Sequence, residues 1–357
     1  MDKIGKLILE DGSVYEGISF GFPVSSSGEI VFTTGMVGYP ESLTDPSYRG
    51  QILVFTYPLI GNYGVPPDSQ EQELLQYFES DRIQVQGMIV SDYSHEHNHW
   101  NGARSLSHWL QEHKIPALYG IDTRALTKKL RERGVMLGKI VIEHDISFDD
   151  PNSRNLVQEV SIPAKKIYSR GPCTVIAVDC GIKNNILRHF LKRDITVIRV
   201  PWDYDFTQEQ YDGVFISNGP GDPKQCHATI KHLKTALQQD KPIFGICLGS
   251  QLLALAAGAD TYKLKYGHRG QNQPCVESGT QRCYITSQNH GYAVDEKTLP
   301  EDWIPWFRNN NDNTNEGIRH KHKPFFAVQF HPEASPGPVD TEFLFDRFVD
   351  LITRRQE

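Results

Sequence analysis

The segment around Cys247 has the residue types and spacing of a nucleophilic site. Cys247 lies between Gly245 and Gly249, after an apolar run at 242–246 and before a helical apolar stretch. This is the G-x-nucleophile-x-G elbow with cysteine in the place of serine, and its glycines remove Cβ atoms where a tight turn passes close to strand and helix. A thiol at a helix N-terminus is favoured as a thiolate, and the N–H of Leu248 can hold an oxyanion. The alternative is a buried core cysteine, the commoner role, but the flanking pattern favours the nucleophile.

A base and an orienting carboxylate follow another predicted strand. The apolar run 325–330 leads directly into His331, Pro332 and Glu333. In an extended segment, residues i and i+2 point to the same side, about 6.6 Å apart along the chain. Glu333 can therefore fix the tautomer of His331, and Pro332 stiffens the segment by locking its own φ. Because a nucleophilic thiol needs a base and the base an orienting group, this segment supplies what Cys247 lacks.

A glycine-containing loop follows a third predicted strand. The strand at 213–216 ends in Ser217-Asn-Gly-Pro-Gly-Asp-Pro223, where Gly219 and Gly221 allow backbone N–H groups to approach a ligand. The alternative is an ordinary Pro-Gly turn. Next to the Cys247 elbow, we interpret Gly219 as the second oxyanion donor, because the two loops would end neighbouring parallel strands.

The elements around these loops alternate between strands and helices. We predict buried strands at 174–178, 196–200, 213–216 and 242–246, and a helix at 184–192. This βαβ order indicates a mostly parallel sheet with helices on both faces. Ligands of such folds bind at the carboxyl ends of the strands, which is where the three loops lie.

The first part of the chain has a different pattern, with strands early and helices later. We predict a hairpin at 6–9 and 14–17, strands at 29–33 and 51–55, and helices at 103–111 and 124–133. Periodicity fades where proline, glycine and polar residues gather, between about 149 and 172. We therefore expect a smaller mixed α/β domain at 1–150, a linker at 151–171 and the α/β domain at 172–357.

Composition excludes several classes of protein. The chain is 38% hydrophobic and 23% charged, with a formal net charge of −7, so nothing favours a nucleic-acid partner. No apolar run reaches the roughly 18 residues of a membrane span, and the N-terminus lacks a signal-peptide pattern, so we expect a cytoplasmic protein. His95, His97 and His99 could share one face of a strand, but no fourth ligand is in view, and we expect a surface loop and no metal.

These motifs resemble a known family. The segments 218–223, 245–249 and 331–333 look like the class I (triad) glutamine amidotransferases. Segments 259–274, 287–294 and 332–338 resemble more closely the glutaminase subunit of carbamoyl phosphate synthetase, and segments 33–40, 43–48 and 57–64 resemble that subunit's N-terminal domain. The resemblance implies that 1–150 is this N-terminal domain and that 172–357 is a class I glutamine amidotransferase domain.

The resemblance also implies roles for individual residues. Cys247 would be the nucleophile, His331 the base and Glu333 its orienter, with Gly219 and Leu248 as oxyanion donors. Glutamine would be held by Ser47 from the first domain and by Gly219, Gly221, Leu248, Gln251, Asn289, Gly291 and Tyr292. His290 would be a spare histidine. Ser250 stands where many relatives have histidine. We expect this difference to alter the tuning of the catalytic site or the contact with the partner subunit, and not to abolish catalysis.

The implied reaction is hydrolysis of glutamine to glutamate and ammonia through a γ-glutamyl thioester. The ammonia would pass through a tunnel to a large synthetase subunit, in a heterodimer or higher oligomer, that makes carbamoyl phosphate from bicarbonate and ATP for arginine and pyrimidine synthesis. No cofactor is expected in this chain, which has no G-x-x-x-x-G-K-[ST] loop; ATP and Mg would belong to the partner. The alternatives are a catalytically silent regulatory or scaffold subunit, or an amidotransferase subunit of another synthase.

Overall fold

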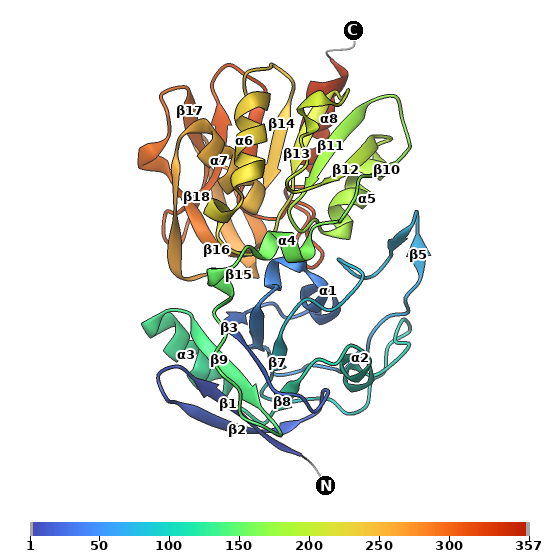
Figure 1. Ribbon diagram of the computed structural model, residues 1–357, viewed down its shortest axis with the longest axis vertical. Helices are drawn as coiled ribbons and strands as arrows, with labels where there is room; N and C mark the ends of the chain where they lie inside the picture. Colours follow the sequence, from blue (N-terminus) through green and yellow to red (C-terminus); the bar gives the residue numbers. More distant parts are fainter. Residues whose placement is uncertain (1–2, 355–357) are drawn as a thin grey trace. The chain divides into compact units, whose positions relative to one another are not determined.

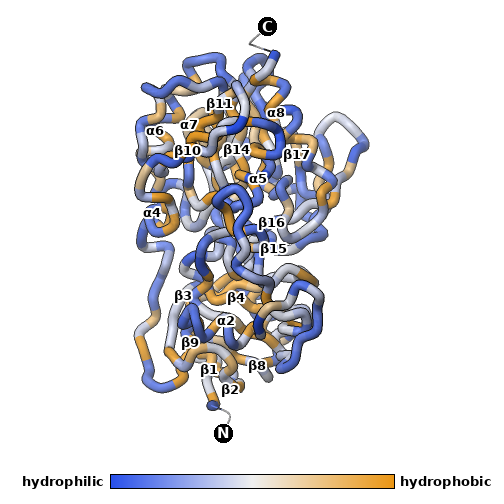
Figure 2. Tube along the Cα trace, turned by 90° about the vertical axis from the view of Figure 1, so that its right-hand side faces the viewer, coloured by the Kyte–Doolittle hydropathy of each residue, from blue (hydrophilic) through white to orange (hydrophobic). Residues whose placement is uncertain are grey.

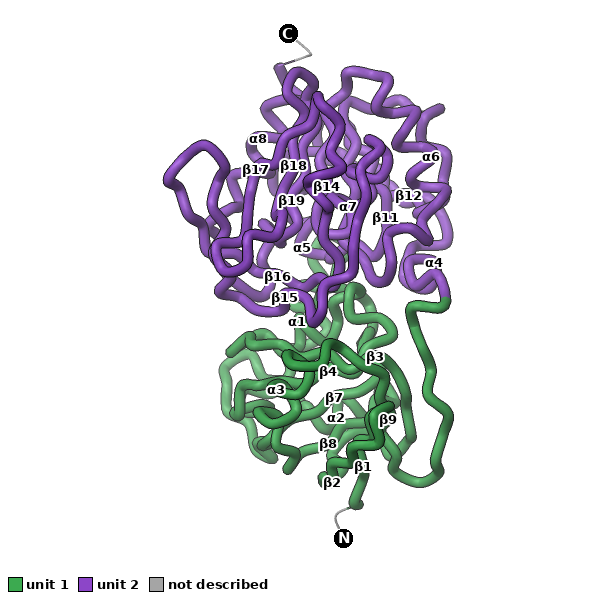
Figure 3. Tube along the Cα trace, turned by 90° about the vertical axis from the view of Figure 1, so that its left-hand side faces the viewer, with its two compact units in different colours: residues 1–153 green, residues 154–357 purple. Residues whose placement is uncertain are grey.

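The computed structural model describes residues 3–354 and contains two compact units, Met1–Ser153 and Arg154–Glu357 (Figures 1 and 3). The segment 151–171, predicted to be a linker, has structure of its own. It contains α4 (Leu156–Val160) and β10 (Lys166–Tyr168), and β10 pairs with a strand of unit 2. The compact division thus falls earlier in the chain than the loss of periodicity indicated, because two short elements in that segment pack against unit 2.

Unit 1 is built around a closed barrel. Its strands follow the order β1-β2-β8-β7-β4-β3-β9, and β9 pairs with β1 to close the ring. Strands β3, β4, β7 and β8 run parallel to one another, and the other pairs are antiparallel. The strands are β1 (Ile4–Leu9), β2 (Val14–Ser19), β3 (Ser26–Thr33), β4 (Gln51–Phe55), β7 (Gly87–Ile89), β8 (Ala117–Tyr119) and β9 (Met136–Val141).

The predicted elements of unit 1 are confirmed in type, but the barrel was not predicted. The hairpin and the two longer strands are β1, β2, β3 and β4, and the two predicted helices are α2 (Leu106–Glu112) and α3 (Thr123–Arg133). Helix α2 begins later than predicted because the Ser105 side chain caps it by accepting from the His108 N–H. Helix α1 (Tyr39–Thr44) and a two-stranded ribbon, β5 (Gln70–Glu71) and β6 (Leu74–Leu75), complete the unit.

Unit 2 contains one large mixed sheet, in the order β10-β12-β11-β13-β14-β19-β18-β17-β15-β16. Its centre, from β12 to β19, is parallel, as predicted, and β18, β17, β15 and β16 extend it with antiparallel strands. The strands are β11 (Thr174–Asp179), β12 (Thr196–Pro201), β13 (Gly213–Ile216), β14 (Ile243–Ile246), β15 (Asp260–Glu277), β16 (Cys283–Asp295), β17 (Trp303–Asn309), β18 (Asn315–His320) and β19 (Phe325–Val328).

Helices cover both faces of this sheet, as the sequence predicts. Alternate strand residues point to opposite faces. Val214 and Ile216 join the apolar cluster under α6 (His227–Ala236) and α7 (Leu248–Ala257). Phe215 instead packs on the ring of Phe190 in α5 (Asn184–Lys192), which also contacts Phe345 in α8 (Phe343–Thr353). Figure 2 shows α7 as hydrophobic along much of its length, in keeping with burial under this sheet.

Within residues 3–354 the helices are all too short or too polar to cross a membrane.

Candidate active site

Cys247 occupies a strained turn between β14 and α7. Its backbone has φ 54° and ψ −106°, a conformation that non-glycine residues rarely adopt. Both flanking glycines are needed, because a Cβ on Gly245 would lie 2.6 Å from the Gly249 carbonyl oxygen and one on Gly249 would lie 2.1 Å from that of Ile216. The Cys247 N–H donates to the Val328 carbonyl (2.8 Å), which ties the turn to β19. The predicted elbow is therefore present.

The thiol of Cys247 is nearly buried and faces β16. The residue is 3% exposed, and its Sγ lies 3.7 Å from the Asn289 carbonyl oxygen. Leu248 is the first residue of α7, so its N–H is one of the free donors at that helix N-terminus. A negative charge on the sulfur, or on an oxygen beside it, would lie at the positive end of the helix dipole.

His331 and Glu333 form a close buried pair just beyond the carboxyl end of β19. Nδ1 of His331 lies 2.6 Å from Oε1 of Glu333. The backbone N–H of His331 donates to the Ser287 carbonyl. Burial alone would lower the pKa of His331, but the charges of Glu333 and Cys247 outweigh it and raise that pKa well above its ordinary value. The carboxylate contact on Nδ1 leaves Nε2 as the nitrogen available for the thiol.

Cys247 and His331 interact, although without an ideal hydrogen bond. The Cys247 side chain raises the pKa of His331 both as a charge and as a hydrogen-bond partner. Within residues 3–354, the buried Nε2 of His331 has no partner at hydrogen-bonding distance and angle. The contact is thus long or poorly aligned, as catalytic hydrogen bonds often are before substrate binds. The structure brings together the three residues that the sequence predicts as a triad.

Lys183 is a member of this site that sequence reasoning missed. Its Nζ lies 3.1 Å from Oε1 of Glu333, and the two side chains are 4% and 0% exposed. Nζ also donates to the Ala334 carbonyl. Burial opposes ionisation of Glu333, but Lys183 and then His331 lower its pKa well below the ordinary value. Lys183 follows β11, so its place at the carboxyl end of a parallel strand was the available signal.

The loop after β13 lies against the elbow, as predicted. A Cβ on Gly219 would lie 2.0 Å from the Cys180 carbonyl oxygen and 2.8 Å from Cδ2 of Leu248. Gly221 has φ +83°, a conformation that favours glycine, and faces Leu156 of α4. The Gly219 backbone and the N-terminus of α7 are therefore neighbours, which is what two donors to one oxyanion require.

The other predicted glutamine contacts in unit 2 lie on α7 and β16. The Gln251 side chain turns back from α7 and donates through Nε2 to the Tyr292 carbonyl (3.0 Å) and the Gln329 side-chain oxygen (3.1 Å). The Asn289 carbonyl oxygen lies 3.7 Å from Sγ of Cys247, and a Cβ on Gly291 would meet Arg269 Nη2 at an ordinary 3.4 Å. Gln251 thus links the elbow helix to the strand segment 289–292.

Ser47 belongs to unit 1, where it lies in the short 3₁₀ turn Pro46–Tyr48. It is buried, and its N–H donates to the Asp45 side chain (2.9 Å). Its predicted contact with glutamine stays a prediction.

Ser250 is the third residue of α7, in the first turn of the helix, and is fully buried. Its N–H donates to the Cys247 carbonyl (3.0 Å), and its Oγ has no hydrogen-bond partner among residues 3–354. Ser250 therefore touches the elbow through its backbone.

His290, expected to be a spare histidine, is part of a buried charged cluster. Residues His268 and His290 are opposite one another on β15 and β16. His268 lies between Glu316 (3.1 Å) and Asp312 (2.8 Å), and His290 Nε2 lies 3.6 Å from Glu316. Nδ1 of His290 is 2.9 Å from the Tyr292 carbonyl oxygen, so the cluster supports the strand segment that faces Cys247.

The same cluster contains the atoms best arranged to hold a metal in the described part of the chain. Ligand atoms of His268, His290 and Glu316 all lie within 4.8 Å of one another. Burial opposes ionisation of Glu316, yet the two histidines lower its pKa, and Glu316 and Asp312 raise the pKa of His268 against its burial. Ion pairs within the cluster account for this arrangement.

His95 and His99 pack against aromatic rings. The His95 ring lies 4.9 Å from that of Tyr93, and the His99 ring lies 6.1 Å from that of Tyr63. The histidines of this segment do not form a group with metal-ligand spacing in residues 3–354.

Each unit contains a segment that matches a known protein family. Residues 7–140 match the family "Carbamoyl-phosphate synthase small chain, CPSase domain", and residues 176–351 match "Glutamine amidotransferase class-I". A solved glutamine amidotransferase from Thermotoga maritima covers 52% of this chain and 85% of its own, at 19% identity and a TM-score of 0.39.

Curated relatives match almost the whole chain. The Multifunctional protein CAD of Squalus acanthias is 55% identical over 352 residues, which are 96% of this chain and 16% of that protein. The Carbamoyl-phosphate synthase (ammonia), mitochondrial, of Homo sapiens is 52% identical over 354 residues, 98% of this chain and 24% of that protein. The chain thus spans between about a sixth and a quarter of the length of these relatives. It belongs to the family of carbamoyl-phosphate synthase small chains, with the CPSase domain followed by a class I glutamine amidotransferase domain.

Proposed function

We propose that this chain hydrolyses glutamine to glutamate and ammonia and supplies the ammonia to a synthetase that forms carbamoyl phosphate. The observation that carries the proposal is the strained Cys247 turn facing the buried His331–Glu333 pair. A thiol, an imidazole and a carboxylate in this order are the parts of a nucleophilic acyl-transfer site.

The first half of the reaction forms a thioester. The Cys247 thiolate attacks the side-chain amide carbon of glutamine, and the N–H groups of Gly219 and Leu248 stabilise the oxyanion. The protonated His331 donates its Nε2 proton to the amide nitrogen. The C–N bond then breaks, ammonia leaves and a γ-glutamyl thioester remains on Cys247.

The second half returns the site to its starting state. Neutral His331 takes a proton from water, and the resulting hydroxide attacks the thioester carbon. The C–S bond breaks, glutamate leaves, and the thiolate and imidazolium are regenerated. Glu333 stabilises the charged imidazole in both steps, and Lys183 keeps Glu333 ionised.

Glutamine is held, in this proposal, by the residues expected from the sequence. They are Ser47, Gly219, Gly221, Leu248, Gln251, Asn289, Gly291 and Tyr292. The neighbouring positions of Gly219, Leu248 and Gln251 around the elbow support the part of this set that lies in unit 2.

The partner is a synthetase region that uses ATP, Mg and bicarbonate. Support comes from the relatives, which are several times longer than this chain and are named as carbamoyl-phosphate synthases or multifunctional proteins. We propose that this region is a separate large subunit, in a heterodimer or higher oligomer, and that the product serves arginine and pyrimidine synthesis. A cytoplasmic location stays a prediction, since several relatives are named as mitochondrial proteins.

A second candidate function is a silent subunit that binds the synthetase without hydrolysing glutamine. It is favoured by relatives of over 50% identity whose name specifies ammonia as the nitrogen source. The complex of this chain with its synthetase distinguishes the two, with glutamine or ammonium chloride as nitrogen donor. We expect glutamine to support carbamoyl phosphate synthesis and Cys247→Ala to abolish this while leaving ammonia-dependent synthesis intact. Synthesis from ammonia alone in the unmodified complex would favour the silent subunit.

A further inference from the structure

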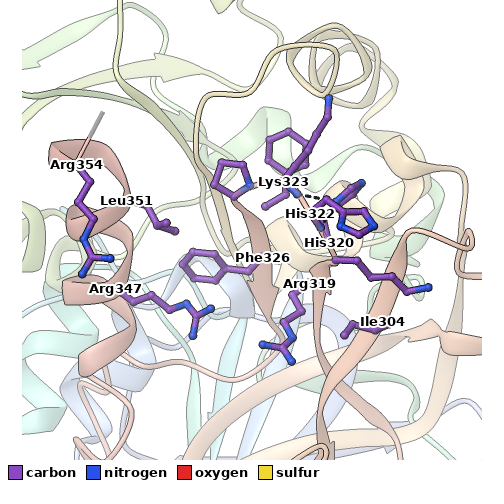
Figure 4. Close-up of a pocket in the computed structure, with 12 residues that line it drawn as sticks. Ile304, Arg319, His320, His322, Lys323, Phe326, Arg347, Leu351 and Arg354 are labelled. Atoms are coloured by element: carbon purple, nitrogen blue, oxygen red, sulfur yellow. Dashed lines mark hydrogen bonds between the residues drawn. The ribbon is translucent and has the colours of Figure 1, made fainter. Parts of the chain in front are cut away.

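A basic pocket opens in unit 2 at the end of the sheet opposite the Cys247 site. It lies where β18 turns into β19, beside one face of α8, and has a volume of about 540 Å³ (Figure 4). His331 follows the carboxyl end of β19, whereas this pocket includes Phe325 and Phe326 at the start of that strand. The pocket is thus separate from the triad and takes no part in the proposed glutamine reaction.

The pocket walls carry cations and no acid. The charged side chains that line it are Arg319, Lys321, Lys323, Arg347 and Arg354, and no aspartate or glutamate of the described chain is among the lining residues. The protein has a formal net charge of −7, so the positive charge of this pocket is opposite in sign to the charge of the whole chain. Positive potential concentrated in a concavity attracts anions.

Arg319 and Arg347 are held in place by one aromatic ring. Their guanidinium carbons lie 5.8 and 4.8 Å from the centre of the Trp306 ring, and that of Arg347 is also 5.7 Å from the centre of Phe326. Cation–π contacts of this kind favour these positions of the two guanidinium groups before any ligand arrives. Figure 4 shows both side chains reaching past Phe326 from two different elements.

The positive charges of Arg319 and Arg347 repel each other. Partial burial and then the charge of Arg319 lower the pKa of Arg347, and the charge of Glu277 opposes this. Among residues 3–354 neither arginine forms an ion pair. An anion that bridged the two groups would relieve this repulsion.

The remaining polar groups of the pocket are partly engaged. Lys323 lies 3.4 Å from Asp240 and donates to the Leu237 carbonyl. His320 accepts the Lys323 N–H at its Nδ1, and burial lowers its pKa. The unpaired positive charge is therefore concentrated on Arg319 and Arg347, with exposed Lys321 and Arg354 at the rim.

An apolar floor accompanies these cations. Ile304, Phe326 and Leu351 line the pocket from β17, β19 and α8. The volume is within the usual range of small-molecule sites, about 300–1,000 Å³. A flexible acidic peptide would need a longer groove, whereas a compact ligand with one anionic end and one apolar end fits both surfaces.

We propose that this pocket binds a phosphorylated small molecule, with the phosphate between Arg319 and Arg347 and an apolar group against Ile304, Phe326 and Leu351. Paired guanidinium groups match the oxygens of a phosphate in bidentate geometry, which a carboxylate satisfies less fully.

Calorimetric titration of the purified chain with phenyl phosphate and with inorganic phosphate, at constant ionic strength, tests the proposal. We expect saturable binding of both, with phenyl phosphate at least threefold tighter because it also covers the apolar floor. The double variant Arg319→Gln/Arg347→Gln is expected to weaken both by at least tenfold, and Leu351→Ala to reduce only the preference for phenyl phosphate.

Lys114→Gln/Arg133→Gln in unit 1 is the matched control, because it removes the same charge from exposed positions that line neither this pocket nor the basic cavity beside α3. Its binding should equal that of the unmodified chain. Absence of saturable binding, or equal weakening in the control, would overturn the proposal. So would binding of a hexaglutamate peptide in preference to phenyl phosphate. Should the double variant fail to fold, the exposed single substitution Arg347→Gln decides the same question.

Discussion

Lys183 Nζ lies 3.1 Å from the Glu333 carboxylate in a fully buried pair, and Glu333 in turn contacts His331. A buried carboxylate without a counter-charge would take up a proton and could not stabilise an imidazolium. Lys183 is thus a positioning residue that acts on the site through Glu333.

Lys183→Met should shift the acid limb of the pH–activity profile to higher pH. The pKa of Glu333 is lowered in the folded chain, so its stabilising contribution is present above its unfolded pKa, about 4.3, and is lost as pH falls through the folded pKa. Without Lys183 the folded pKa rises, and loss begins at a higher pH. We also expect a loss of about 3–5 kcal/mol in the free energy of unfolding, because one partner of a buried pair is removed.

Glutaminase kcat/KM and denaturant unfolding, each measured across pH, check this prediction. Lys183→Arg keeps the charge and serves as control, with an acid limb close to that of the unmodified chain. An acid limb that stays in place in Lys183→Met would show that Lys183 does not control Glu333.

Glu333→Gln should shift the alkaline limb of the pH–activity profile to lower pH. Glu333 raises the pKa of His331 against the effect of burial, so an amide in its place lowers that pKa and the imidazolium is lost at a lower pH. Since imidazolium donates the proton to the leaving nitrogen, kcat should fall by about 10²- to 10⁴-fold. NMR titration of the His331 ring reports the pKa even where activity is too low to measure. An unchanged titration curve contradicts the account.

Cys247→Gly should be more stable than Cys247→Ala by about 1 kcal/mol, although both lack activity. The φ of 54° at this position strains any residue with a Cβ, and glycine relieves the strain. Urea unfolding of the two variants measures the difference. Equal stability would mean that the turn relaxes when the thiol is removed.

Gly219→Ala should damage both stability and turnover. The added Cβ would lie 2.0 Å from the Cys180 carbonyl oxygen, so the loop must move away from Leu248, at about 1–3 kcal/mol in stability. Gly291→Ala is the matched control for stability, because its Cβ would meet only Arg269 Nη2 at 3.4 Å. Thermal unfolding of both variants, and kcat of Gly219→Ala against the unmodified chain, provide the comparison. A Gly219→Ala chain as stable and active as the unmodified one would exclude the second oxyanion donor.

The elbow could be predicted from sequence because its constraints are local. Gly245, Cys247 and Gly249 are close in the chain, and each glycine is required by a contact within or beside the same turn. His331 and Glu333 likewise follow from the i, i+2 spacing of an extended segment. The parallel centre of the unit 2 sheet followed from the βαβ order of its strands.

Contacts between distant segments were not predictable in this way. Lys183 meets Glu333 from another strand loop, and His290 meets Glu316 across the sheet, so no local spacing marks either pair. The barrel of unit 1 includes β7 and β8 between β4 and β2, and each of these strands is three residues long and too short to show periodicity. The placement of β10 in the unit 2 sheet depends on pairing with β12, which composition does not reveal.

The most direct test of the glutamine site is to trap its covalent intermediate. The complex is mixed with radiolabelled glutamine, quenched in acid within the first turnover and digested for mass spectrometry. We predict a γ-glutamyl label on the peptide that carries Cys247, absent in Cys247→Ala and hydrolysed slowly in Glu333→Gln. Release of labelled glutamate by Cys247→Ala at an unchanged rate, with no label on that peptide in the unmodified chain, would contradict the account.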